Sequence, residues 1–74
     1  MIKVNAVETG KNIKRLIYKN NITYKEIQTR CMFGTTQAIY KWMRGDSIPS
    51  IDNLVILADM FKCRLDDIIV VDRR

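Results

Sequence analysis

Apolar residues recur three or four positions apart through most of the chain, a spacing that predicts amphipathic helices. In the N-terminal third, three apolar residues follow this spacing: Ile13, Leu16 and Ile17. Thr9 stands ahead of them as the expected N-cap of a helix over 9–20. The pair Asn20 and Asn21 predicts the end of that helix, because asparagine tolerates the left-handed backbone conformation.

The next two helices are each expected to open at a threonine. Thr23 and Glu26 have the T-x-x-E spacing of a capping box, in which the side chain of each residue accepts a free backbone amide of the other. Thr35 is the expected cap of the following helix, after a turn over 31–34. Gly45 stands where a helix C-terminus favours a positive φ.

The two ends of the chain have other patterns. Residues 1–8 alternate apolar and polar positions and predict an arm or a short strand. Val70 and Val71 are β-branched, so the tail can leave its helix and pair with that arm, in the same chain or a partner. The expected fold is all-α and lambda-repressor-like, with a short terminal β pair as an option. The five expected helices cover 9–20, 23–31, 35–44, 50–61 and 65–70, the fourth capped by Ser50.

Length and charge narrow the function. We expect the seventy-four residues to form one small domain, 1–74, with no room in it for a separate sensing or catalytic domain. Residues 1–44 carry nine Lys or Arg and two acidic side chains, a net charge of +7, whereas residues 45–74 carry a net charge of −2. A basic half suits a polyanion partner, although an ordinary lysine-rich surface explains the charge equally well.

Several classes of protein are disfavoured by what the chain contains. Cys31 and Cys63 stand apart without a CxxC pair, and there is no histidine, so we expect free thiols in a reducing cytoplasm and no metal or cofactor. The longest apolar run, 54–58, is too short to span a membrane. No nucleophile–base pair and no glycine-rich phosphate loop is present, so we expect neither an enzyme nor a small-molecule ligand.

Residues 10–70 contain four blocks at characteristic spacings: GKNIKRL, ITYKEIQ, TTQAIYKWMRGDSIPSIDNLVILADMF and LDDII. In these blocks the chain resembles the Cro/lambda-repressor (Xre-type) family of helix-turn-helix regulators. The third block is the most specific one. The resemblance implies a five-helix fold in which the second and third helices bind double-stranded DNA. It also implies operator binding, commonly as a homodimer, by a phage or mobile-element transcription regulator such as a repressor.

The resemblance and the chemistry of the side chains together predict the DNA contacts. The expected base contacts are Thr36, Gln37, Tyr40 and Lys41. The expected phosphate contacts are Thr23, Tyr24, Lys25, Thr35 and Arg44. Gln37 can bond adenine through two atoms, and Thr36 can contact a base edge or a thymine methyl group. Tyr40 and Lys41, one turn further along, would reach a base edge or the flanking backbone.

The chain departs from the family pattern at three positions. Tyr24 stands where the family often has a glutamine that braces the phosphate and the third helix. The usual turn glycine aligns near Met32, and Gly34 follows two residues later, so we expect a turn that is one residue longer. Arg64 stands where a serine usually caps the last helix.

Some residues allow two interpretations. Trp42 could stack on a nucleic-acid base, but its spacing from Ile39 favours the core. Tyr18 lies on the surface or contacts a phosphate, and the sequence does not separate the two.

The assembly and the class of partner are also open. We expect a homodimer built by Leu65 to Val71, with closure of the monomer core as the other role of this tail. The alternative function is a protein-interaction or antitoxin-like module, for which Val55 and Ile56 offer an apolar surface.

Overall fold

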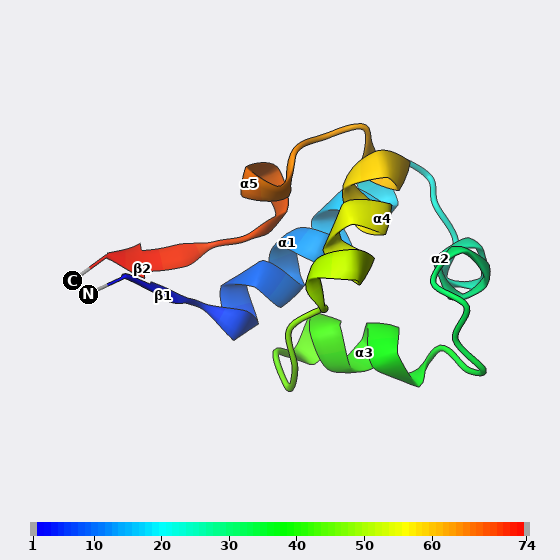
Figure 1. Cartoon of the computed structure of the whole chain (residues 1–74), viewed down its shortest axis with the longest axis horizontal. Helices are drawn as coiled ribbons and strands as arrows, with labels where there is room; N and C mark the ends of the chain where they lie inside the picture. The colour runs from blue at the N-terminus through cyan, green and yellow to red at the C-terminus, as the bar shows by residue number, and fades with distance from the viewer. Residues whose placement is uncertain (1, 74) are drawn as a thin grey trace.

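The computed structural model describes residues 2–73, which form five helices and two short strands (Figure 1). Residues 1 and 74, the first position of the predicted arm and the last of the predicted domain, lie outside the described residues. In chain order the elements are β1 (Ile2–Val4), α1 (Ala6–Lys19), α2 (Tyr24–Arg30), α3 (Gln37–Arg44), α4 (Ile51–Phe61), α5 (Leu65–Ile68) and β2 (Val71–Arg73). The mostly helical fold with a terminal β pair is confirmed.

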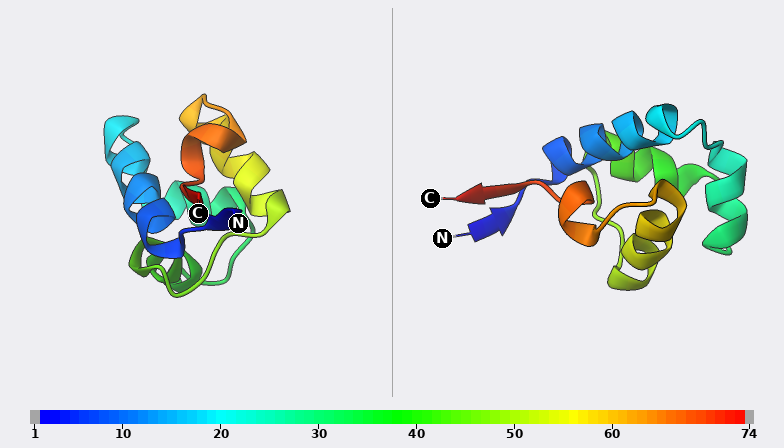
Figure 2. Two further views of the ribbon diagram at one scale, coloured as in Figure 1. Left: turned by 90° about the vertical axis from the view of Figure 1, so that its left-hand side faces the viewer. Right: turned by 90° about the horizontal axis from the view of Figure 1, so that it is seen from above.

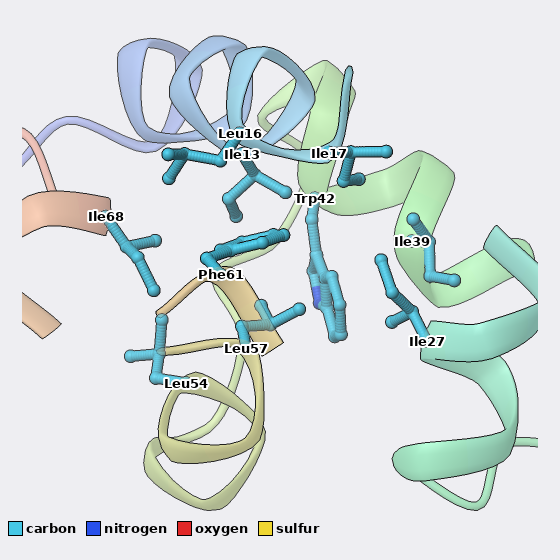
Figure 3. Close-up of a cluster of buried hydrophobic side chains, with 10 residues drawn as sticks. All are labelled: Ile13, Leu16, Ile17, Ile27, Ile39, Trp42, Leu54, Leu57, Phe61 and Ile68. Atoms are coloured by element: carbon cyan, nitrogen blue, oxygen red, sulfur yellow. The ribbon is translucent and has the colours of Figure 1, made fainter. Parts of the chain in front are cut away.

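The core of the described residues collects the apolar faces of all five helices (Figure 3). Its buried members are Ile13, Leu16, Ile17, Ile27, Ile39, Trp42, Leu54, Leu57, Phe61 and Ile68. Trp42 is 4% exposed, and its ring packs edge-on against Phe33 with the centroids 5.6 Å apart. The prediction that Trp42 belongs to the core, rather than to a stacking surface, is therefore confirmed.

Helix α1 lies directly against the end of α3 because Gly10 has no side chain. A Cβ atom at this position would overlap the carbonyl oxygen of Trp42 and come within 2.9 Å of that of Met43. This close approach fixes the position of α3, the helix expected to bind DNA, relative to the longest helix of the domain.

The start of α1 corrects the prediction. Its N-cap is Asn5, whose side-chain oxygen accepts the amide of Glu8 at 2.9 Å, so the helix begins three residues before Thr9. Thr9 is inside the helix and is 1% exposed, and its hydroxyl accepts the amide of Val70 at 2.9 Å. Both residues are good caps, and the apolar pattern that begins at Ile13 gave no means of choosing between them.

The four longer helices end in the same way, with a residue in the left-handed conformation and two backbone hydrogen bonds that close the last turn. The left-handed residues are Asn21, Met32, Gly45 and Lys62, with φ of 54°, 59°, 81° and 57°. The expectations for Asn21 and Gly45 are confirmed. Met32 has the conformation that glycine adopts most readily, at the position where the family usually has its turn glycine.

The chain leaves the last helix earlier than predicted. Helix α5 ends at Ile68, not at residue 70, and Ile69 is already extended. The segment then forms β2, which pairs antiparallel with β1 through Ile2 with Arg73, Lys3 with Asp72 and Val4 with Val71. The tail therefore pairs with the N-terminal arm of its own chain, one of the two options that the sequence left open. The two paired strands, β1 and β2, form a ribbon that extends from the helical body (Figure 2).

Polar side chains at the start of α1 hold this tail in place. Thr9 bonds Val70, and the Asn12 amide group donates to the carbonyl oxygens of Asp67 and Ile68 at 2.7 and 2.9 Å. Asn5 adds a bond from its backbone amide to the Val70 carbonyl at 2.8 Å. These bonds satisfy backbone groups that neither a helix nor the ribbon would otherwise pair.

Candidate nucleic-acid interface

Helix α2 lies at the end of the molecule opposite the two strands, and α3 runs back from it, with its last turn against the start of α1 (Figure 1). The predicted capping box fixes the start of α2: the Thr23 hydroxyl accepts the Glu26 amide, and the Glu26 carboxylate accepts the Thr23 amide, each at 3.1 Å. Between the helices, the amide of Met32 bonds the Thr29 carbonyl and that of Phe33 bonds the Gln28 carbonyl. These two bonds form the Schellman arrangement, and Phe33 then packs on Trp42, so the turn is joined to the core.

The outer face of α3 carries most of the residues predicted to contact bases. Gln37, Tyr40, Lys41 and Arg44 together line a shallow hollow of about 230 Å³, and all four are exposed. The opposite face of the same helix buries Ile39 and Trp42. The helix is therefore held by its apolar face and presents its polar face to the outside.

The start of α3 differs from the prediction by two residues. The helix begins at Gln37, and its N-cap is Thr36, whose side chain makes no capping bond. The Thr35 hydroxyl instead accepts the amide of Gln37 at 3.2 Å. The predicted role of Thr35 as N-cap is wrong by one position, because two adjacent threonines offer the same side chain. Thr36 is half-buried, so it is less available to a base than Gln37 is.

The residues predicted to contact phosphate differ in how many contacts they already make within the protein. Lys25, in the first turn of α2, is exposed and makes no ion pair with any of residues 2–73. The hydroxyls of Thr23 and Thr35 each accept a backbone amide, and that of Thr23 also donates its proton to the Glu26 carboxylate at 3.0 Å, which a phosphate would have to displace. Arg44 is 2.8 Å from the carboxylate of Asp46 in an exposed ion pair, which a phosphate would have to displace.

Three tyrosines from three helices meet beside this face. The rings of Tyr24 and Tyr40 pack edge to face, with centroids 5.4 Å apart and planes at 78°. The hydroxyls of Tyr18 and Tyr24 are 3.4 Å apart. The bond to Tyr18, followed by burial, raises the pKa of Tyr24 to about 12. The sequence separated these residues and gave no signal that they meet.

Reactive thiols, metal-binding groups or membrane-spanning helices would indicate other kinds of site in residues 2–73. Burial raises the pKa of the half-buried thiols of Cys31 and Cys63, which keeps them protonated rather than nucleophilic. The described part of the chain has no group of three His, Cys, Asp or Glu residues placed to hold a metal ion. None of its helices combines the length and the apolar character that a membrane crossing requires.

A helix-turn-helix family model matches residues 13–68, about three quarters of the chain, and includes α2, the turn and all of α3. The chain belongs to the Cro/lambda-repressor-like (Xre-type) helix-turn-helix family. It is therefore a helix-turn-helix DNA-binding regulator in the general sense of that family. Searches of curated proteins and of solved structures gave no match. The matched region excludes the ribbon and the first turns of α1.

Proposed function

We propose that this helix-turn-helix protein binds a specific double-stranded DNA sequence and regulates transcription by occupying an operator. The observation that carries this proposal is the outer face of α3, where Gln37, Tyr40, Lys41 and Arg44 are exposed together. A helix with this face outward fits the major groove of B-DNA, which is wide enough to admit it.

The proposed contacts follow from the position of each group. Gln37, in the first turn of α3, bonds an adenine through both atoms of its amide, and Thr36 contacts a neighbouring base. Tyr40 and Lys41 reach the next base pair or its backbone. Lys25 from α2 and Arg44 from the end of α3 neutralise phosphates on either side of the groove.

Phosphate contacts at the start of α2 belong to the same proposal. Tyr24 and Thr23 lie next to Lys25, and Thr35 lies just before α3, so these residues can face the backbone that flanks the groove. The protein would act in the cytoplasm as a repressor of phage or mobile-element type. Neither a cofactor nor a small ligand is required for binding of this kind.

Operator recognition of this kind also favours a homodimer. One helix reads few base pairs, whereas two helices about one DNA turn apart read a longer, pseudo-palindromic site. Within the predicted interface, Leu65 to Val71, Ile68 is buried in its own core, so the ribbon that follows is the better candidate. Its strands have unpaired outer edges among the described residues, and Ile2 is exposed. Such edges pair readily with a second copy.

The test of DNA recognition is binding to fragments of genomic DNA at physiological salt, with competitor DNA present. We expect one fragment to be retained and the logarithm of affinity to fall linearly with the logarithm of salt. Four to six phosphate contacts give a slope of roughly −4 to −5 per protomer. A flat salt response would contradict DNA binding, and equal retention of all fragments would contradict sequence specificity.

The test of the dimer is sedimentation of the full chain and of a chain that ends at Ile69, which lacks β2. We expect the full chain to associate at tens of micromolar and the shortened one to remain monomeric while keeping its helical content by circular dichroism. If both are monomeric and both bind DNA as single protomers, the homodimer is excluded.

One observation favours a second function, binding to another protein. Ile51 and Val55 lie on one face of α4 and are 68% and 54% exposed, and Ile48 in the preceding loop is exposed as well. An antitoxin-like module would use such an apolar surface. The uncharged substitution Val55→Gln distinguishes the two functions, because it should leave DNA affinity unchanged and weaken binding to a protein partner.

A further inference from the structure

The contacts among Tyr18, Tyr24 and Tyr40 join three helices that are separated in sequence by residues 20–23 and 31–36. Tyr18 lies near the end of α1, Tyr24 is the first residue of α2, and Tyr40 is in the middle of α3. Tyr24 is the central member, because its ring contacts Tyr40 and its hydroxyl faces that of Tyr18. It is half-buried, whereas Tyr18 and Tyr40 are 62% and 43% exposed. The central ring is therefore the fixed part of the group.

The contact matters because of where Tyr40 lies. This residue lines the hollow on the outer face of α3 together with Gln37, Lys41 and Arg44. An exposed tyrosine on a helix surface normally exchanges among rotamers, and ordering it on binding costs affinity. The edge-to-face contact with Tyr24 restricts that exchange before DNA arrives.

The hydroxyl pair holds Tyr24 in turn. One hydroxyl of the pair donates to the other, and the acceptor keeps its own proton for an outside group. Tyr18 thus anchors the outer end of Tyr24, while Tyr40 contacts its ring.

We propose that Tyr24 is a positioning residue: its ring fixes the orientation of Tyr40 and thereby sets the base preference at the position that Tyr40 contacts. This inference rests on the proposed function, since it assigns one base preference of the same DNA-binding face. A positioning role differs from a phosphate contact in its effect, because loss of a phosphate contact would change affinity for all sequences alike.

The test uses a set of matched substitutions. Tyr24→Leu removes the ring, Tyr24→Phe keeps the ring and removes the hydroxyl, and Tyr18→Phe removes only the anchor. Affinity is measured for the preferred site and for every single-base change in it. The ring-proton chemical shifts of Tyr40 are measured in the free protein, and thermal unfolding confirms that each variant is folded. If Tyr24→Leu does not fold, Tyr24→Met replaces it.

We expect Tyr24→Leu to reduce discrimination at a single base position by roughly 2- to 10-fold, the range that the aromatic pair can contribute. Tyr24→Phe should restore that discrimination even if overall affinity falls. The Tyr40 ring shifts should move most in Tyr24→Leu, and less in Tyr18→Phe, which removes the hydroxyl contact and keeps every ring. In a Tyr40→Leu background, Tyr24→Leu should have no further effect on discrimination.

Unchanged base preference in Tyr24→Leu would overturn the inference, and so would a loss spread equally over all positions, which would mean that the Tyr24 ring acts as a backbone contact. An equal loss in Tyr24→Phe and Tyr24→Leu would also overturn it, because the hydroxyl rather than the ring would then be the active part. If the unmodified protein has no base preference, the proposed function fails instead, and the Tyr40 ring shifts still report whether the ring contact exists.

Discussion

The two ends of this domain are held by different kinds of interaction. At the ribbon end, Asn5, which caps α1, and Thr9 and Asn12 within α1 bond the backbone of residues 67, 68 and 70. Around α2 and the turn into α3, the rings make contacts, with Phe33 on Trp42 and Tyr24 on Tyr40, and an exposed ion pair of 2.7 Å between Arg30 and Asp59 joins α2 to α4. The first end is fixed through hydrogen bonds to the backbone, and the second mainly through the packing of rings, with polar contacts only at its surface.

The difference suits what each end has to do. A side chain that bonds one particular backbone amide specifies a single register for the tail, and it satisfies groups that would otherwise be buried without partners. Ring contacts hold helices without using hydrogen-bonding groups. The amide of Gln37 and the ammonium groups of Lys25 and Lys41 therefore remain available to a ligand.

The largest effect is expected where the apolar end joins the core. Trp42→Ala removes a side chain that is 4% exposed and should lower the free energy of unfolding by about 3–5 kcal/mol, through lost burial and a cavity. In so small a domain this can unfold the protein. Urea unfolding followed by circular dichroism measures the change. A stable variant that only loses DNA affinity would place Trp42 in the binding face instead.

At the polar end, Thr9→Val should lower the free energy of unfolding by about 1–3 kcal/mol, because the amide of Val70 loses its acceptor inside the protein. Thr9→Ser keeps the hydroxyl and is the matched control, with a smaller loss. Hydrogen exchange at the Val70 amide should accelerate in the valine variant only. The base preference should not change, and a changed preference would show that the two ends are coupled.

The sequence predicted the helices and the core well because both depend on local patterns. The capping box of Thr23 and Glu26, the left-handed Gly45 and the buried Ile39 and Trp42 all follow from spacing, capping chemistry and side-chain size. The start of α1 was missed because Asn5 and Thr9 are both capable caps. The choice between them depends on a backbone group 61 residues away.

Fewer of the contacts at the candidate site could be predicted from the sequence. The exposed face of α3 was predictable because it is the complement of the apolar stripe. The meeting of Tyr18, Tyr24 and Tyr40 was not, since it depends on how three helices cross. The pairing of Arg44 with Asp46 was likewise missed, although the two residues are close in sequence.

Gln37→Ala tests whether the exposed face of α3 contacts bases. We expect a loss of about 1–3 kcal/mol in affinity for the preferred site and relaxed selectivity at one base position. Lys25→Ala is the matched control, because loss of a phosphate contact should weaken binding to all sequences alike. Stability should not change in either variant, since both side chains are exposed. An unchanged preference in Gln37→Ala would show that another residue contacts that base.

The turn between α2 and α3 offers a smaller effect of opposite sign. Met32 has a φ of 59° and is 84% exposed, so Met32→Gly relieves backbone strain and removes few contacts. We expect a gain of about 1 kcal/mol in the free energy of unfolding. Gly34→Ala is the control, because an added Cβ there meets nothing within 4 Å and no left-handed conformation is involved. A loss of stability in Met32→Gly would show that the methionine side chain makes a contact that outweighs the strain.

The smallest effect concerns the ion pair beside the DNA-binding face. In the free protein Asp46 competes with phosphate for Arg44, and its negative charge also repels the DNA backbone. Asp46→Asn should therefore raise DNA affinity by about 2- to 5-fold at low salt, and the gain should shrink as salt screens the charge. Asp66→Asn makes the same change in net charge near the start of α5, away from α3, and should raise affinity less. Equal gains in the two variants would mean that net charge alone is responsible, and that Arg44 does not contact phosphate.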